Sequence, residues 1–117
     1  MYADLHLHTH YSDGTYTPEE LAECGREHGL KVMALTDHDN LSGVMRFSRA
    51  ARSLGLHSII GAELTLKDGY HLTLLAQDAE GYSNLSRLLS FSHVLADDRT
   101  DPKLDKKFLA EHSEGLI

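Results

Sequence analysis

The chain has 117 residues, 41% of them apolar and 25% charged, which is the composition of one ordinary globular domain. Its formal net charge of −7 argues against a broad basic surface for nucleic acid, although not against a site whose acidic ligands are neutralised by divalent cations. Apolar runs of the length that spans a membrane, about 18 residues, and a signal-peptide pattern are absent from the sequence. The single cysteine, Cys24, excludes an internal disulfide, and we expect a cytoplasmic protein without membrane contact.

Residues 2–8 predict a first strand that ends in His6-Leu7-His8. A strand has a period of two, so both histidines should point to the same side. Two imidazoles on one face are poorly suited to an apolar core. They could supply half of the ligands of a metal site, because neutral imidazole is a common ligand of transition metals. The alternative interpretation is a surface strand that happens to carry histidines.

The next residues predict two helices, each followed by a strand. Thr17-Pro18-Glu19-Glu20 is a capping box that predicts the start of a helix. This helix should run to about residue 28, where Gly29 is placed to end it. Short apolar runs at 31–36 and 57–63 predict strands, with a helix at about 41–54 between them. This β-α-β-α-β order with apolar strands indicates a parallel sheet covered by helices, and therefore an α/β fold.

The pattern then changes to a hairpin. Alternating residues at 64–66 and 70–76 flank Lys67-Asp68-Gly69, and Asp-Gly is a strong turn signal. A helix is predicted at 81–95, an exposed loop at 97–105 and a short helix at 104–112. Residues 115–117 look like the opening of another strand, so we expect residues 1–117 to be the N-terminal portion of a longer, truncated fold.

Metal-capable side chains gather where the predicted parallel strands end. Carboxyl ends of such strands meet at one edge, where catalytic groups collect in α/β proteins. A shared metal site explains this placement better than coincidence. The residues at or just beyond the ends of these three strands are His6, His8, Asp13, Asp37, His38 and Glu63.

His71 is a weaker candidate. In the register of a two-residue turn it would face Leu66 and lie on the opposite side of the hairpin from Glu63. A bulge or a wider loop would be needed to bring it to the cluster. The remaining histidines are interpreted as surface or capping groups: His28, His57, His93 and His112.

The order of these motifs resembles that of the polymerase and histidinol phosphatase (PHP) family. The matching segments are His6-Leu7-His8, Ser12-Asp13-Gly14, Thr36-Asp37-His38, Gly61-Ala62-Glu63 and the downstream His71. The resemblance implies a distorted (β/α)7 barrel that hydrolyses phosphoesters with up to three metal ions. It also implies that Asp37 belongs to the catalytic site behind the ligands, which would be His6, His8, Asp13, His38, Glu63 and His71.

The strings at 71–76, 80–85 and 111–117 look like the N-terminal PHP domain of bacterial DNA polymerase III alpha subunits. The short Ser12-Asp13-Gly14 loop is closer to free-standing members of the family. The resemblance therefore implies a phosphoesterase site within a DNA polymerase, a 3′–5′ exonuclease or a pyrophosphatase-like activity. Two alternatives stay open: a segment of a free-standing phosphoesterase for small phosphates or nucleotides, and a non-catalytic structural module.

The resemblance also sets the expected cofactors and partners. Histidine and carboxylate ligands suit Zn, Mn or Fe alike, and bound divalent ions make a hydroxide nucleophile available at neutral pH. The expected substrate is a phosphoester, DNA included. A fragment with half of the barrel should be weakly active or inactive, and its open sheet edge favours dimers.

Overall fold

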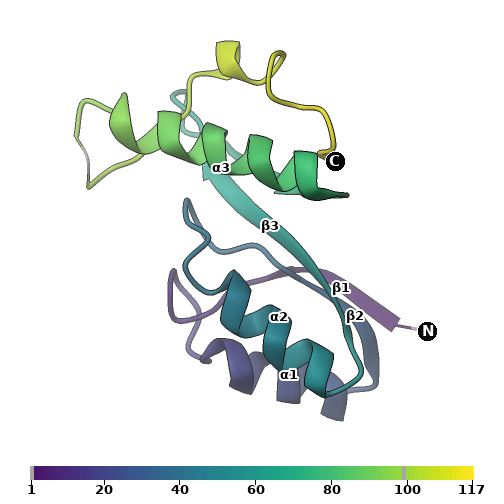
Figure 1. The fold of residues 1–117 in the computed structure, drawn as a ribbon. Coiled ribbons are helices and arrows are strands. Elements are labelled where there is room, and N and C mark those ends of the chain that lie inside the picture. The colour runs from purple at the N-terminus through teal and green to yellow at the C-terminus, as the bar shows by residue number, and fades with distance from the viewer. Residues whose placement is uncertain (1, 99) are drawn as a thin grey trace.

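A four-stranded sheet of order β1-β2-β3-β4 organises the chain in the computed structural model, which describes residues 2–98 and 100–117 (Figure 1). The first three strands are parallel, and β4 runs antiparallel to β3. The predicted β-α-β-α-β order followed by a hairpin is therefore confirmed. The elements are β1 (Tyr2–Leu7), α1 (Pro18–Glu27), β2 (Leu30–Leu35), α2 (Val44–Ser53), β3 (His57–Thr65), β4 (His71–Leu75), α3 (Ala79–Val94) and the short 3-10 helix η1 (Lys106–Phe108).

Side-chain caps fix where the helices begin. Thr17 Oγ1 accepts a hydrogen bond from the Glu20 N–H at 3.1 Å, as the capping box predicts. α3 begins two residues before its predicted start, because Asp78 Oδ1 accepts from the Gly81 N–H at 2.8 Å. α2 begins later than predicted, at Val44, because Asn40 and the residues after it form a side-chain-stabilised turn first.

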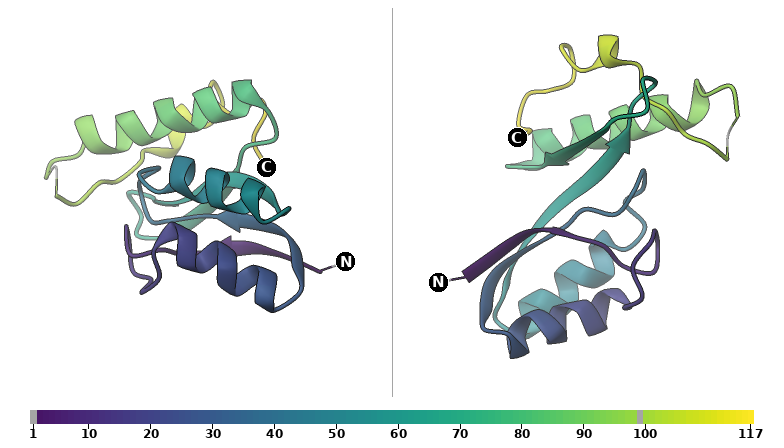
Figure 2. Two further views of the ribbon diagram at one scale, coloured as in Figure 1. Left: turned by 60° about the horizontal axis from the view of Figure 1, so that its bottom comes forward. Right: turned by 180° about the vertical axis from the view of Figure 1, so that it is seen from behind.

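Two apolar cores lie along the curled sheet. In the first, α1 and α2 pack against β2, with Phe47 and Met33 fully buried. In the second, α3 packs against the later part of β3, with Leu64 and Leu88 fully buried. β3 runs from one half of the molecule to the other, as Figure 2 shows from two further sides. Leu41 packs against both cores and marks their junction.

The hairpin between β3 and β4 turns through residues 67–69, as the sequence predicted. The Leu66 N–H donates to the Tyr70 carbonyl at 2.8 Å, and the Gly69 N–H donates to the Leu66 carbonyl at 2.9 Å. Gly69 has φ +90°, which places it in the left-handed region, as in three-residue hairpin loops. The wider loop that His71 needs is therefore present: His71 pairs with Thr65, two residues from Glu63 on the same face of the strand.

The predicted helix at 104–112 is also wrong for most of its length. Only η1 is helical there, because the buried Leu104 is used as a strand residue, bridged to Leu66, and Asp105 caps the short turn that follows. The predicted strand opening at 115–117 is present as a pairing of Leu116 with Ala76. Among the residues that the structure describes, no helix has the length and apolar character needed to cross a bilayer.

Candidate metal centre

Backbone pairing brings the ends of β1, β2 and β3 to one edge. Thr36, just after β2, donates its N–H to the Leu7 carbonyl at 2.8 Å, and its hydroxyl contacts the Leu7 N–H at 3.1 Å. His38 bridges to Glu63, so the ladder continues beyond the end of β2. The parallel order of the strands therefore carries residues far apart in sequence to the same place.

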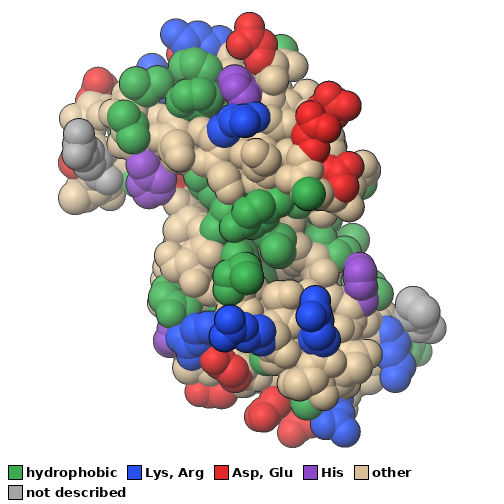
Figure 3. All heavy atoms as spheres, viewed as in Figure 1, with side chains coloured by type: hydrophobic (Ala, Val, Ile, Leu, Met, Phe, Trp, Pro, Cys, Tyr) green, Lys and Arg blue, Asp and Glu red, His purple; other side chains and the backbone are tan. Residues whose placement is uncertain are grey.

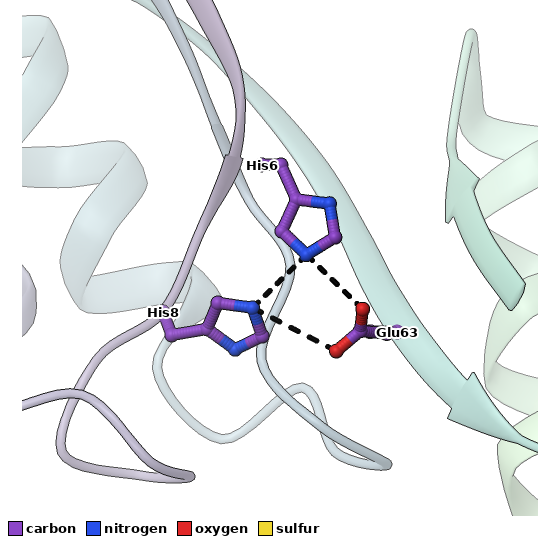
Figure 4. Close-up of side chains that lie close together, drawn as sticks. All are labelled: His6, His8 and Glu63. Atoms are coloured by element: carbon purple, nitrogen blue, oxygen red, sulfur yellow. Dashed lines mark hydrogen bonds and ion pairs between the residues drawn. The ribbon is translucent and has the colours of Figure 1, made fainter. Parts of the chain in front are cut away.

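His6, His8 and Glu63 form the first group (Figure 4). The two histidines project from β1 and its end toward the carboxylate on β3. His6 Nε2 lies 3.1 Å from both His8 Nε2 and Glu63 Oε1. His8 Nε2 lies 3.7 Å from Glu63 Oε2. The prediction that both histidines face the same way agrees with these distances.

Asp13 joins His8 and His38 in the second group. Its Oδ1 lies 3.1 Å from His8 Nδ1, and its Oδ2 lies 3.0 Å from His38 Nε2. Its side chain is 64% exposed, so this group lies at the solvent side of the cluster.

The third group takes His38, Glu63 and His71. His38 Nδ1 lies 2.9 Å from Glu63 Oε2, and His71 Nδ1 lies 4.0 Å from the same oxygen. Both ring nitrogens of His38 therefore face carboxylates, one from Asp13 and one from Glu63. His71 is the outlying member of the cluster, with a side chain 48% exposed.

The three groups share members in a closed ring, because His8, His38 and Glu63 each belong to two of them. Within each group the candidate ligand atoms lie within 4.8 Å of one another. Ligands of a tetrahedral ion with bonds of about 2.1 Å lie about 3.3 Å apart, close to the shorter distances here. Imidazole nitrogens and carboxylate oxygens are also the donors that Zn, Mn and Fe accept. The residues present therefore fit a cluster of divalent ions.

Asp37 lies behind this cluster and is buried. Its carboxylate accepts from the Thr9 N–H and hydroxyl, both at 2.6 Å, and from the Ser12 hydroxyl at 2.7 Å. Ser12 Oγ in turn lies 3.4 Å from His8 Nδ1. Asp37 thus holds the loop after β1, which carries Asp13, and its oxygens are occupied by these donors.

A charged pair braces the same loop from outside. Arg46 on α2 contacts both carboxylate oxygens of Glu19 on α1 at 2.8 Å and donates to the Tyr11 hydroxyl at 2.9 Å. The Arg46 guanidinium lowers the pKa of the Glu19 carboxyl. The hydrogen bond between Arg46 and Glu19 also raises the pKa of Arg46 above its usual value.

Asp39, Thr65 and His93 are linked by hydrogen bonds beside the cluster, and no motif in the sequence predicted them as part of the site. The signal available was a fourth polar residue after Thr36-Asp37-His38. Interpreting His93 as a surface or capping group overlooked its contact with the Asp39 carbonyl at 2.6 Å. His28 and His112 each contact a backbone carbonyl of their own helix or turn, as expected of capping groups.

A family model for the PHP domain matches residues 4–117. The chain belongs to the PHP domain family. It is 45% identical over 103 residues to an error-prone DNA polymerase of Symbiobacterium thermophilum, covering 86% of this chain and 10% of that protein. It is 36% identical over 129 aligned positions to the DNA polymerase III subunit alpha of Helicobacter pylori, covering 99% of this chain and 11% of that one. The chain thus spans about a tenth of the length of these curated relatives.

Solved structures of PHP-like proteins share the fold. A protein of Bifidobacterium adolescentis described as a metal-dependent phosphoesterase superposes with a TM-score of 0.62 at 29% identity, over 78% of this chain and 32% of that one. A two-domain protein of Bacteroides vulgatus with a PHP-like phosphoesterase superposes with a TM-score of 0.65 at 20% identity, over 97% and 33%. The curled sheet therefore matches part of the PHP barrel, and the predicted fold class is confirmed.

Proposed function

We propose that this chain carries the metal-dependent phosphoesterase site of the PHP domain of a DNA polymerase III alpha-type protein. The observation that carries the proposal is the ring of three ligand groups, in which Glu63 and His38 each serve two groups. The relatives named as DNA polymerases support the context, and the solved phosphoesterases support the chemistry. Zn, Mn and Fe are the candidate ions.

Each residue of the cluster has a definite part in this proposal. Glu63 presents its two oxygens to different histidines of two groups, which would suit a carboxylate shared by neighbouring ions, whereas Asp13 presents its two oxygens to His8 and His38 within one group. His6 and His71 each contribute at one group and suit terminal coordination. Asp37 holds the Asp13 loop in place. Divalent ions bound there would supply a hydroxide at neutral pH and charge to offset that developing on the phosphate.

The exposed members of the cluster indicate where substrate would approach. The Asp13 side chain is 64% exposed and those of His6 and His71 are 48% exposed, whereas the Glu63 side chain is only 12% exposed. The ions would therefore lie between a buried carboxylate and an open rim. An extended phosphodiester such as a DNA 3′ end fits such a rim better than a substrate that must be enclosed, so a 3′–5′ exonuclease is the proposed activity.

Metal uptake tests the site directly. We expect the chain to bind Zn²⁺ or Mn²⁺ and His8→Ala to lose at least one ion per chain, because His8 belongs to two groups. Elemental analysis after dialysis measures the stoichiometry, and His57→Ala, at the exposed start of β3, is the matched control. Unchanged stoichiometry in His8→Ala would overturn the ligand assignment.

Hydrolysis tests the activity. The metal-loaded chain, with only part of the barrel, should release nucleotides slowly from a 3′-labelled oligonucleotide, and His8→Ala should be slower by about a hundredfold, on the order of the loss of one catalytic group. Metal uptake without cleavage of this probe or of bis-p-nitrophenyl phosphate, by this chain and by a PHP domain with the whole barrel, would instead favour a structural role for the ions. Cleavage of small phosphate monoesters alone would favour the free-standing phosphoesterase.

A further inference from the structure

Asp39 has an unusual backbone conformation at the edge of the metal cluster. Its φ is +55°, and it is the one non-glycine residue with a positive φ among residues 2–98 and 100–117. The left-handed region costs most side chains about 1–2 kcal/mol, although Asp tolerates it better than others. Such outliers persist where surrounding contacts hold them, and they gather at functional sites.

The contacts that hold Asp39 come from two other elements. Thr65, the last residue of β3, donates its N–H to Asp39 Oδ1 at 2.8 Å and its hydroxyl to Oδ2 at 2.7 Å. The Asp39 N–H donates to the Glu63 carbonyl at 3.0 Å. His93 on α3 lies with Nε2 2.6 Å from the Asp39 carbonyl, so Nε2 carries the proton that is donated. The left-handed turn is therefore held by three hydrogen bonds to β3 and one to α3.

These contacts surround the third ligand group. His38 is the residue before Asp39. The Glu63 carbonyl accepts a hydrogen bond from the Asp39 N–H. Thr65, which the Asp39 carboxylate grips, is the cross-strand partner of His71. His38 is therefore one peptide bond from Asp39, Glu63 is one backbone hydrogen bond away, and His71 is reached through the strand partner Thr65. Asp39 itself belongs to none of the three ligand groups.

We infer that Asp39 is a positioning residue that sets the spacing of His38, Glu63 and His71, and so governs one ion position without ligating it. The His6, His8 and Glu63 group depends less on this clamp, because His6 lies on β1 and His8 directly follows it. Loss of the clamp should therefore weaken the His38, Glu63 and His71 site most. This inference rests on the proposed metal site.

Three variants separate the carboxylate from the backbone conformation. Asp39→Gly keeps access to φ +55° and removes both acceptor oxygens. Asp39→Asn keeps one acceptor oxygen and a side chain that tolerates the left-handed region. Thr65→Val removes only the hydroxyl donor from the other side of the contact. Asp101→Gly, in the exposed loop after α3, is the matched control for the loss of a carboxylate.

Co²⁺ titration of the chain, followed by its visible absorption, and Mn²⁺ per chain after equilibrium dialysis give the readout. We expect Asp39→Gly to weaken one class of sites about tenfold or more, as loss of residues that orient ligands does, with the remaining class affected less. Asp39→Asn and Thr65→Val should fall between Asp39→Gly and the unaltered chain. Urea unfolding in EDTA reports whether each variant is folded.

The outcomes separate the two proposals. Asp39→Gly that binds Co²⁺ and Mn²⁺ as the unaltered chain does, or that loses no more than Asp101→Gly, overturns the inference. If Asp39→Gly does not fold, Thr65→Val decides: unchanged affinity at every site overturns the inference. An unaltered chain that takes up no ions overturns the proposed metal site instead, whatever the variants do.

Discussion

Asp37 shows how one buried carboxylate can organise a loop of the candidate metal centre without being one of its candidate ligands. Its two oxygens accept hydrogen bonds from Thr9 and Ser12, all of 2.7 Å or less. A buried charge needs such donors, and here they tie the loop that carries Asp13 to the end of β2. The ligand that comes from the least regular segment is thus held by the most buried acid of the site.

Replacing Asp37 by Asn should destabilise the fold and loosen the loop. The amide nitrogen would face a donor where the carboxylate accepts one, and hydrogen bonds to charged groups contribute about 1.5–3 kcal/mol each. We expect the free energy of unfolding to fall by about 2 kcal/mol or more, measured by urea denaturation in EDTA. Asp101→Asn is the surface control. A change within about 0.5 kcal/mol, as at ordinary surface positions, would contradict this account.

At the scale of elements, the β3–β4 hairpin decides whether His71 reaches the cluster. Its three-residue loop pairs His71 with Thr65, whereas a loop one residue shorter would turn the strand's side chains to the other face. The same hairpin stands where a β-α-β crossover would otherwise place a helix.

An apolar groove remains between the two halves, lined by residues such as Leu56, Ile59 and Leu75, and Figure 3 shows apolar side chains gathered there.

Gly69→Ala should strain this turn. Gly69 has φ +90°, and nothing lies within 4 Å of an added Cβ, so the cost comes from backbone conformation alone. We expect a loss of about 1–2 kcal/mol in unfolding free energy, measured in urea. Gly69→Asn should lose less, because Asn tolerates the left-handed region. Equal stability of all three chains would show that the turn is not held in this conformation.

At the scale of the whole molecule, the ligand groups join the two halves. His6 and His8 come from the half with the first core, whereas His71 comes from the hairpin that packs under α3. An ion bound by such a set stabilises only the folded chain, so saturation should raise the free energy of unfolding by RT ln(1 + [L]/Kd), about 2.7 kcal/mol at a hundredfold excess over Kd.

Thermal unfolding with and without Zn²⁺ checks this expectation. The midpoint temperature should rise with added ion and return to its starting value with excess EDTA. His8→Ala should show a smaller rise, because it removes a member of two groups. A midpoint that does not move at ion concentrations that saturate binding would argue against ligands drawn from both halves.

The sequence was informative wherever one local rule was enough. Parallel strands share their carboxyl edge, so the convergence of His8, His38 and Glu63 followed from element order alone. The hairpin register did not follow, because one residue in turn length reverses every facing side chain and Asp-Gly suits more than one loop. The helix predicted at 104–112 failed because Leu104 is buried as a strand partner of Leu66, a tertiary contact that periodicity cannot report.

The Asp39 clamp could not be predicted for a related reason. Asp39 with its left-handed backbone, the end of β3 and helix α3 come together there. No spacing in the sequence links positions 39, 65 and 93. Only the structure shows that a histidine of α3 contacts the carbonyl of a residue beside a ligand.

Leu41 is the contact that the two cores have in common, and Glu63 sits on the strand that crosses their junction. Motion of one half relative to the other would therefore change the distances from the Glu63 oxygens to the histidine nitrogens before either core is exposed to solvent. A bound ion would restrict this motion at the junction of the two cores. Amide hydrogens of β3 near Glu63 would then exchange with solvent more slowly in the loaded chain, while those at the outer ends of α1 and α3 would be little affected.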